Sequence, residues 1–348
     1  MHIVSDGTIV SDGPKPPRYP FAIVHPRGPL FRLLPLRVRR RLLYMWGHRR
    51  IGNFTKPSRW SEKMQWRVLN DLRPLLQVGA DKLASKEYAR RIVEEHGLAN
   101  LVKIPATYWV GTDLAELRAL EGKLPSRWVL KPNHTSGRFI IVDSTERPVD
   151  WGEVLRVASR WINPDEQEYM LGHQLYTRAR HLLFAEERVG DGPQPPHDLR
   201  VFGFAGDHRP PNIYELQCNI GSHTEASTTF RYDKNFIRKR SVHAADGRAE
   251  ESSLLDEMPQ EARETLKRFG SLALQPFDHV RVDLYYERGL FWFGELAVYP
   301  ASGLSAFSTD VDRGAAWTLT DLAATDPREG EWRALLESTP MGILQNNV

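Results

Sequence analysis

Two acidic residues near the C-terminal end, Asp283 and Glu295, are spaced as a metal-binding pair would be. They lie on consecutive strand-like segments separated by a turn at Arg288-Gly289. A turn centred on Gly289 would place the two carboxylates opposite each other on one face of a hairpin, whereas a one-residue slip would separate them. Like charges directly opposite destabilise a sheet unless something positive lies between them. The spacing therefore predicts a divalent cation at this hairpin.

A second group of polar residues could bind phosphate. Lys131 ends a short strand and precedes the polar loop 132–138. A lysine can neutralise phosphate oxygens as a point charge, and a loop containing Ser and Gly can offer backbone N–H groups. Later strands carry the pair Glu186-Glu187 and the pair Asp198 and Arg200. Together with carboxylates for Mg²⁺, these residues predict a nucleotide site.

Several other sites are excluded by inspection. The sequence has no P-loop, no Gly-x-Gly-x-x-Gly, no paired histidines at zinc-protease spacing and no Gly-x-Ser-x-Gly. His223-Thr224-Glu225 is similar to the His-x-Glu of zinc deaminases, but the partner cysteines are absent. The single cysteine, Cys218, also rules out an internal disulfide. A reducing compartment fits this composition.

The composition indicates a folded protein. With 348 residues, 41% hydrophobic residues and ten Trp, the chain can fill a substantial core and divide into two or three lobes. The net charge of +3 does not by itself identify a ligand. The aromatic residues between 285 and 293 favour sheet packing over base stacking, so we expect no nucleic-acid partner. Without a signal peptide or a membrane-spanning run, we expect a cytoplasmic protein.

The hydrophobic pattern predicts the elements that would position these residues. Helices are expected at 61–72, 81–96, 151–161, 169–178 and 258–274, and strands at 128–131, 139–142, 181–187, 198–204 and 211–217. The Gly- and Pro-rich loop 190–196 is the best internal boundary. Residues 1–20, rich in Gly, Pro, Ser and Asp, predict a flexible tail.

Residues 31–46 mix arginines with large apolar residues. The basic stretch 37–41 could make peripheral contact with an anionic membrane surface or hold an acidic polymer. The simpler interpretation is a helix that packs its apolar stripe on the protein and keeps its arginines in water.

The order of these segments resembles the ATP-grasp superfamily, specifically the group named after the teichuronopeptide-biosynthesis protein TupA. The resemblance runs from about Asn53 to Trp317. It is carried by residues 57–66 (Pro-Ser-Arg-Trp-Ser-Glu-Lys-Met-Gln-Trp), 80–82 (Ala-Asp-Lys), 129–137 (Val-Leu-Lys-Pro-Asn-His-Thr-Ser-Gly), 185–187 (Ala-Glu-Glu), 198–202 (Asp-Leu-Arg-Val-Phe), 280–284 (Val-Arg-Val-Asp-Leu) and 293–296 (Phe-Gly-Glu-Leu).

The resemblance implies an α+β ATP-grasp fold, in which two α+β lobes clasp ATP beside a mainly helical N-terminal region. The implied divisions are a tail at 1–20, the helical region at 21–102, a small lobe with the phosphate loop and hinge at 103–190, and a large lobe with the metal-binding hairpin at 191–348.

The resemblance also implies ATP and Mg²⁺ as cofactors and assigns a role to each site residue. Lys82 and Lys131 would reach the phosphates, under a loop of His134, Thr135, Ser136 and Gly137. Glu186 would meet the adenine amino group, the backbone from Glu187 to Val189 would frame the base, and Asp198 would meet the ribose. Lys131, Arg200 and Arg281 would be the catalytic cations, and Asp283 and Glu295 would bind the metal. His134 is given no proton-transfer role.

Two departures from the family pattern carry information. The phosphate loop has a single glycine, Gly137, followed by Arg138, which implies stiffer closure and an added cation. Ala297 stands two residues after Glu295, where many superfamily members have a metal-binding Asn. One magnesium ion would then lack a side-chain ligand.

The implied activity is an ATP-dependent carboxylate–amine ligase that forms an amide through an acyl phosphate. Such catalysis depends mainly on positioning and charge neutralisation. The implied substrates are small-molecule or saccharide carboxylates and amines, used in cell-envelope polysaccharide decoration or in peptide natural-product biosynthesis.

Two alternatives stay open: phosphoryl transfer to a hydroxyl acceptor, and a degenerate nucleotide-binding module. Residues 219–236, with His223, Thr224, Arg231 and Asp233, and also Arg313, could contact the acceptor. A surface loop and a helix-start ion pair are the simpler interpretations of these two features.

Overall fold

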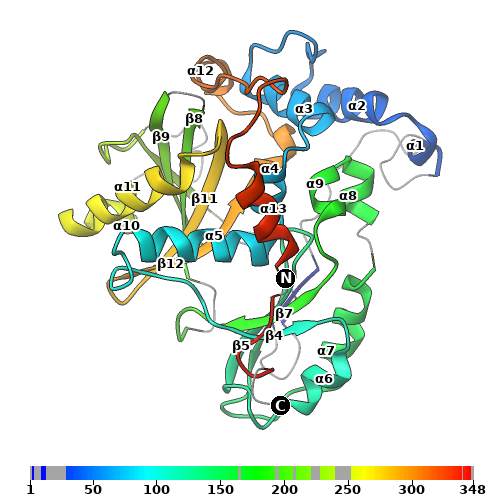
Figure 1. Ribbon diagram of the computed structural model, residues 1–348, viewed down its shortest axis with the longest axis vertical. Helices are drawn as coiled ribbons and strands as arrows, with labels where there is room; N and C mark the ends of the chain where they lie inside the picture. Colours follow the sequence, from blue (N-terminus) through cyan, green and yellow to red (C-terminus); the bar gives the residue numbers. More distant parts are fainter. Residues whose placement is uncertain are drawn as a thin grey trace.

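The computed structural model describes residues 2–3, 9–12, 29–163, 166–192, 196–206, 209–220, 228–239, 252–338 and 340–345. Within these residues the strands form two six-stranded sheets, ordered β1-β2-β6-β5-β7-β4 and β10-β9-β8-β11-β12-β3. Figure 1 shows the first sheet below the second, with helices packed around both. We call the two parts the small lobe and the large lobe. The fold is α+β, as predicted.

The strands of the small-lobe sheet are β1 (His2–Ile3), β2 (Ile9–Asp12), β4 (Thr107–Gly111), β5 (Arg127–Pro132), β6 (Arg138–Asp143) and β7 (Leu183–Glu187). Those of the large-lobe sheet are β3 (Val102–Lys103), β8 (Asp198–Gly206), β9 (Arg209–Ile220), β10 (Thr228–Tyr232), β11 (His279–Glu287) and β12 (Leu290–Ala297). Among these pairs only β12 and β3 run parallel.

The helices before β8 are α1 (Pro29–Leu33), α2 (Leu36–His48), α3 (Trp60–Asn70), α4 (Pro74–Ala80), α5 (Lys82–Glu95), α6 (Leu114–Ala119), α7 (Trp151–Ala158), α8 (Glu166–Leu171) and α9 (Gln174–Arg178). Those after it are α10 (Leu254–Glu257), α11 (Gln260–Leu274), α12 (Asp310–Ala316) and α13 (Glu329–Glu337). Short 3-10 helices lie at Ser159–Trp161 (η2) and Pro300–Gly303 (η4).

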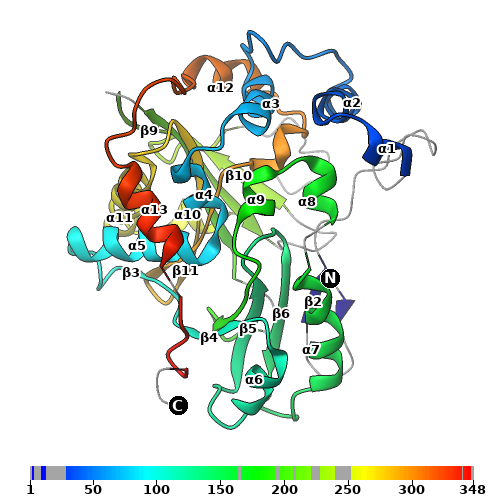
Figure 2. The same cartoon turned by 45° about the vertical axis from the view of Figure 1, so that its right-hand side comes forward.

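Each sheet has an apolar face and a polar face, because side chains alternate along a strand. In the small lobe, Trp128 and Leu130 of β5 pack with residues of α6 and α7, which lie on the outer side of the sheet (Figure 2). In the large lobe, Val280, Val282 and Leu284 of β11 pack in the main core with residues of α11 and α5. The opposite faces carry the polar residues that the sequence singled out.

The predicted element types are confirmed for every segment named, with small shifts at the ends. The one expected helix that differs clearly is 169–178, which is two helices, α8 and α9. Gly172 separates them with φ +71°, and a Cβ there would lie 2.0 Å from Leu36 Cδ1. Glycine is therefore required at this break.

The structure describes part of the N-terminal region. Residues 9–12 of the expected tail form β2, which pairs antiparallel with β6; most of the other residues between 1 and 20 lie outside the described ones. In the expected helical region at 21–102, Trp60, Met64 and Leu76 belong to the same apolar core as the large-lobe sheet.

The interpretation that the arginines of the basic stretch stay in water is wrong for two of them. Arg39 and Arg40 are 6% and 0% exposed. Arg39 donates to the Tyr169 and Met170 carbonyls, and Arg40 donates to Gln65 Oε1 at 2.8 Å and to the Leu171 carbonyl at 2.9 Å. These buried hydrogen bonds fasten α2 to α3 and α8.

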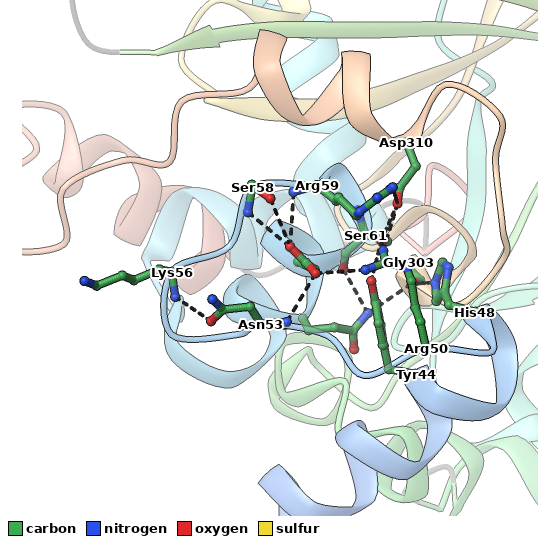
Figure 3. Close-up of polar contacts among 12 residues, drawn as sticks. Tyr44, His48, Arg50, Asn53, Lys56, Ser58, Arg59, Ser61, Gly303 and Asp310 are labelled. Atoms are coloured by element: carbon green, nitrogen blue, oxygen red, sulfur yellow. Dashed lines mark hydrogen bonds and ion pairs between the residues drawn. The ribbon is translucent and has the colours of Figure 1, made fainter.

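The motif at 57–66 forms a structural joint (Figure 3). The buried Glu62 carboxylate accepts from the backbone N–H groups of Asn53, Ser58 and Arg59 at 3.1–3.2 Å and pairs with Arg50 at 2.9 Å. Burial would raise the pKa of Glu62, but these donors lower it. Arg50 also pairs with Asp310 at 3.1 Å, which joins the loop before α3 to α12.

The C-terminal segment connects the two lobes. Helix α13 contacts α4 and α5 of the large lobe. The chain then continues to the edge strand β4, where Ile343 N donates to Thr107 O at 2.9 Å and Leu344 N donates to Tyr108 O at 3.1 Å. The Gln345 side-chain amide bonds both backbone groups of Val110 at 2.9 Å. No helix among the described residues is long and apolar enough to cross a membrane.

A fully buried ion pair fixes the hairpin strands against α3. Arg67 Nη2 lies 2.7 Å from Asp278 Oδ1, and both side chains are at most 1% exposed. Arg67 also donates to the carbonyls of His279, where β11 starts, and of Val298, just after β12. Asp278 accepts from Trp317 Nε1 at 2.9 Å.

Asp278→Asn should destabilise the fold by about 3 kcal/mol, because it leaves Arg67 as an uncompensated buried charge. Burial alone would raise the pKa of Asp278, but Arg67 and Arg73 lower it to about 2. The carboxylate therefore stabilises the fold above its unfolded pKa of about 4, and this contribution is lost as pH falls toward 2. Urea unfolding at several pH values measures both effects. Glu329→Gln, which removes an exposed pair on α13, is the matched control; equal effects of the two variants would contradict the prediction.

Candidate functional site

The structure places Asp283 directly opposite Glu295, as predicted. The turn and the strand register that bring them together differ from those predicted. The turn has two residues, Arg288 and Gly289, both with positive φ, and pairs Glu287 with Leu290. Continued regularly, that register would set Asp283 against Gly294. A bulge between Asp283 and Leu284 shifts it by one residue and brings Glu295 across.

Gly294 allows the two strands to lie unusually close together at this bulge. A Cβ at this position would lie 3.0 Å from the carbonyl oxygen of Asp283. Glycine therefore lets the two backbones approach where the carboxylates meet.

Cations of the protein surround the two carboxylates. Arg281 makes a two-point hydrogen bond with Asp283, with Nε 2.6 Å from Oδ1. Its Nη2 lies 3.9 Å from Glu295 Oε1, and Lys82 Nζ lies 3.7 Å from Glu295 Oε2. Arg200 Nε lies 4.0 Å from Asp283 Oδ2. The like charges are thus partly compensated without a metal ion.

The two carboxylates have different proton affinities. Burial raises the pKa of Asp283 to about 6, with a contribution from Glu295, although Arg281 and Arg200 oppose the shift. Burial would also raise the pKa of Glu295, but Lys82 and Arg281 lower it. Glu295 keeps 30% of its side chain exposed, whereas Asp283 keeps 13%. Asp283 is therefore the carboxylate that a further positive charge would stabilise most.

Strand β8 contributes Arg200 and Asp198 to the same face. Arg200 pairs with Asp283 in the register of β8 and β11. Asp198 Oδ2 accepts from Arg200 at 3.0 Å. With its side-chain amide oriented so that the oxygen faces the guanidinium, Asn219 also accepts from Arg200, at 2.5 and 2.7 Å. These two partners hold Arg200 toward the hairpin.

In the small lobe, the Glu186 carboxylate lies between two lysines. Lys131 Nζ is 2.5 Å from Oε1, and Lys86 Nζ is 2.6 Å from Oε2. Burial would raise the pKa of Glu186, but the lysines lower it to about 2. Burial also lowers the pKa of Lys86, against the attraction of Glu186. The structure thus uses Glu186 to hold Lys131.

The same face of the small-lobe sheet carries an apolar cluster of Val129, Phe139 and Ile141. Val129 pairs in register with both Ile141 and Glu186. Next to it, Glu187 pairs with Ala106 through its backbone N–H at 2.8 Å and through its carboxylate, which accepts from the Ala106 N–H at 3.0 Å. Val189 follows and is buried. The face could take a flat apolar group beside Lys131.

The loop at residues 133–137 is attached to the start of α5. Asn133 accepts from the backbone N–H groups of Lys82 and Leu83, and Lys82 Nζ donates to the Thr135 carbonyl. Gly137 has φ +71°. His134 is buried and stacks on His181 with ring centroids 4.2 Å apart. Burial, His181 and Lys82 lower the pKa of His134 to about 4, so its ring is neutral at pH 7.

Two groups near the site were missed from the sequence. Lys86 could have been found, because it lies four residues after Lys82 and hence on the same side of a helix. The second group is a buried series of hydrogen-bonded side chains next to the loop at residues 133–137, and no sequence pattern indicated it. Thr135 Oγ1 donates to Glu168 at 3.2 Å, His173 contacts Glu168 at 2.5 Å and Ser302 Oγ at 2.7 Å, and Arg40 donates to Ser302 Oγ at 2.9 Å.

The predicted acceptor residues that the structure describes, Asp233, Arg231 and Arg313, are engaged in other contacts. His223 and Thr224 lie outside the described residues. Asp233 accepts from the backbone N–H groups of Asn235 and Ile237. Arg231 Nη1 lies 3.6 Å from Glu215, and the fully buried Arg313 pairs with the same carboxylate at 2.6 Å. Arg313 of α12 thus forms a core ion pair with Glu215 of β9.

The residues present fit magnesium and a nucleotide triphosphate. Among the described residues no cluster of three His, Cys, Asp or Glu could hold a metal alone. Mg²⁺ is, however, commonly bound by one or two carboxylates together with substrate phosphates. The raised pKa of Asp283 marks a carboxylate that lacks sufficient positive charge. Lys82, Lys131 and Arg200 lie close enough to Glu295 to lower its pKa, so three positive charges accompany the carboxylate pair.

Comparison with known sequences agrees with this arrangement. The sequence model described as TupA-like ATP-grasp matches residues 62–315. The chain belongs to the TupA-like ATP-grasp family. In this TupA-like protein the match includes the lysines of α5 and the hairpin carboxylates. No curated protein matches it significantly.

Solved structures with partial similarity to this TupA-like protein include two ligases. A D-alanine–D-alanine ligase from Bacillus anthracis complexed with ATP is 14% identical, with TM-score 0.37, over 75% of this chain and 66% of that one. An L-amino acid ligase from Bacillus licheniformis is 15% identical, with TM-score 0.38, over 70% and 48%. The chain thus spans about half to two thirds of their length.

Glu186→Gln should destabilise this TupA-like protein by about 3 kcal/mol, because it leaves the buried Lys86 without a counter-charge. Adding Lys86→Met should restore at least half of the loss, and urea unfolding of the two single variants and the double variant gives the coupling. Glu187→Gln is the control, since an amide oxygen can still accept from the Ala106 N–H. A Glu186→Gln variant as stable as the control would show that this ion pair does not matter.

Proposed function

We propose that this chain is an ATP-dependent carboxylate–amine ligase. The observation that carries the proposal is the cation-flanked pair of Asp283 and Glu295, with Lys82 from another element 3.7 Å from Glu295. Membership of the TupA-like ATP-grasp family supports ATP as the nucleotide. Carboxylates and cations on facing elements suit an anionic ligand that carries a divalent metal.

In this proposal each residue acts by charge or by position. Lys131, held by Glu186, and Lys82, fastened to the loop, neutralise the phosphates. Arg200 does the same from β8, in the orientation set by Asp198 and Asn219. Asp283 and Glu295 hold Mg²⁺, which, when bound, screens the phosphate charge. Arg281 orients Asp283 and limits the repulsion between the two carboxylates.

The nucleotide base would lie on the small-lobe sheet. Val129, Phe139 and Ile141 offer an apolar surface, and the backbone from Glu187 to Val189 would frame the edge of the base. The Glu186 carboxylate is engaged by two lysines, so an adenine amino group would share it with them. Asp198 would meet the ribose.

The reaction proceeds in two transfers. A substrate carboxylate oxygen attacks the γ-phosphorus of ATP, and the bond to the ADP oxygen breaks, giving an acyl phosphate. A substrate amine then attacks the acyl carbon and displaces inorganic phosphate, leaving an amide after loss of a proton. Because two anions must approach each other in the first step, the cations on both lobes lower its barrier. No covalent enzyme intermediate is needed.

The proposed substrates are a small-molecule or saccharide carboxylate and an amine, as in cell-envelope polysaccharide decoration or peptide natural-product biosynthesis. Release of inorganic phosphate only when both substrates are present would support the ligase. Phosphate retained on a hydroxyl acceptor would instead identify a phosphotransferase.

The first test is titration calorimetry of ATP with and without Mg²⁺. Asp283→Asn and Glu295→Gln should each weaken magnesium-dependent binding at least about tenfold, or about 1.4 kcal/mol, because each removes one metal-binding charge at nearly constant size. Glu261→Gln, on the exposed side of α11, should bind as the wild type does. Binding that is indifferent to both hairpin substitutions would refute the metal assignment. No binding by the wild type would favour a degenerate module.

A further inference from the structure

The charge of the chain is distributed very unevenly. Residues 13–61 contain 12 lysines and arginines and no aspartate or glutamate. The whole chain has 47 basic and 44 acidic residues, which leaves 35 basic and 44 acidic residues outside this segment. One segment thus carries a formal charge of +12 and the remainder carries −9. Such asymmetry is typical of proteins that bind an extended anionic surface.

Among the described residues of this segment, some of the arginines are used inside the fold and others are exposed. Arg39 and Arg40 are buried and hold α2 in place. Arg32, Arg37 and Arg41 are exposed; Arg37 reaches Asn70 at 3.4 Å in an exposed contact. Apart from Gly47, which has no side chain, the exposed residues of α2 are Arg37, Val38, Arg41 and Met45, whose spacing of three and four residues defines one side of the helix. This side points away from the protein.

The same segment is rich in exposed apolar side chains. Five of the twelve large apolar side chains that are exposed in the described part of the chain lie between residues 30 and 51. They are Leu30, Leu33, Val38, Met45 and Ile51, of which Leu33 and Ile51 are 80% and 86% exposed. In both overall views α1 and α2 occupy an outer corner of the molecule (Figures 1 and 2). Leu30, Leu33 and Ile51 are each more than half exposed.

We propose that the outer face of α1 and α2 binds the surface of an anionic lipid bilayer. Apolar side chains interleaved with arginines match an interface in which acyl chains lie just beneath anionic headgroups. A soluble acidic polymer would attract the arginines but would leave Leu30, Leu33 and Ile51 in water. The paired apolar and cationic character therefore favours the bilayer. This face shares no residue with the nucleotide site, so the two proposals stand independently.

Sedimentation of the full chain with lipid vesicles tests the proposal. Vesicles of equal parts phosphatidylcholine and phosphatidylglycerol should bind the protein at least about tenfold more tightly than pure phosphatidylcholine vesicles, and salt should weaken this binding. The triple variant Arg32→Glu, Arg37→Glu, Arg41→Glu should lose most of it. A variant with Arg118→Glu, Arg160→Glu and Lys267→Glu makes the same charge change at exposed positions elsewhere and should still bind.

The double variant Leu30→Ser, Leu33→Ser separates a bilayer from a soluble polymer. It should weaken vesicle binding several-fold while leaving capture of soluble polyglutamate unchanged, and Val311→Ser with Leu322→Ser is its exposed apolar control. Unchanged vesicle binding by the Leu30 and Leu33 variant would overturn the proposal in favour of an acidic polymer. Equal binding of both vesicle types, or none, would also overturn it. Circular dichroism and magnesium-dependent ATP binding confirm that each variant is folded.

Discussion

Burying carboxylates close together requires nearby cations, and this requirement organises the space between the two sheets. Asp283, Glu295, Asp198 and Glu186 face that space, and Lys82, Lys86, Lys131, Arg200 and Arg281 accompany them. These cations come from α5, β5, β8 and β11. The charges are therefore balanced only when both sheets and α5 are correctly placed. A site with five cations and four carboxylates remains able to accept a larger anion together with a divalent metal.

The alternation of side chains along the strands separates this charge from the core. On β11, Val280, Val282 and Leu284 point into the apolar core, and Arg281 and Asp283 point to the site. The N-terminal motif contributes to the same arrangement without touching the site. Arg67 holds the start of β11, and Glu62 organises the loop before α3. Arg67 and Glu62 thus support the site indirectly, through the strand and the loop that they hold.

Periodicity predicted the helices and strands well, because most of them bury one face and solvate the other. It also predicted that Asp283 faces Glu295, although the true turn has two residues and the bulge at Gly294 corrects the register. A bulge depends on close backbone approach, which spacing alone does not reveal. The sequence also did not predict that two lysines pair with Glu186, or that a series of hydrogen bonds connects Thr135 to Arg40. These residues are far apart in sequence and meet only through tertiary packing.

The arginines between 37 and 41 also show what the sequence cannot predict without the tertiary structure. Sequence alone could not tell that Arg39 and Arg40 are buried while Arg37 and Arg41 are exposed, because this depends on which carbonyls α8 presents. Helical periodicity gives relative directions around α2, and only the neighbouring elements decide which direction is inward.

The last described residues of the chain affect both the small-lobe sheet and the connection between the lobes. Strand β4 lies at the edge of its sheet, and residues 343–345 cover that edge with backbone and side-chain hydrogen bonds. The same segment follows α13 on the large lobe, so it adds a link between the lobes to those that the chain makes between β3 and β4 and between β7 and β8. Without residues 343–345, β4 would be an open edge that could pair with another chain, so removing them would favour self-association.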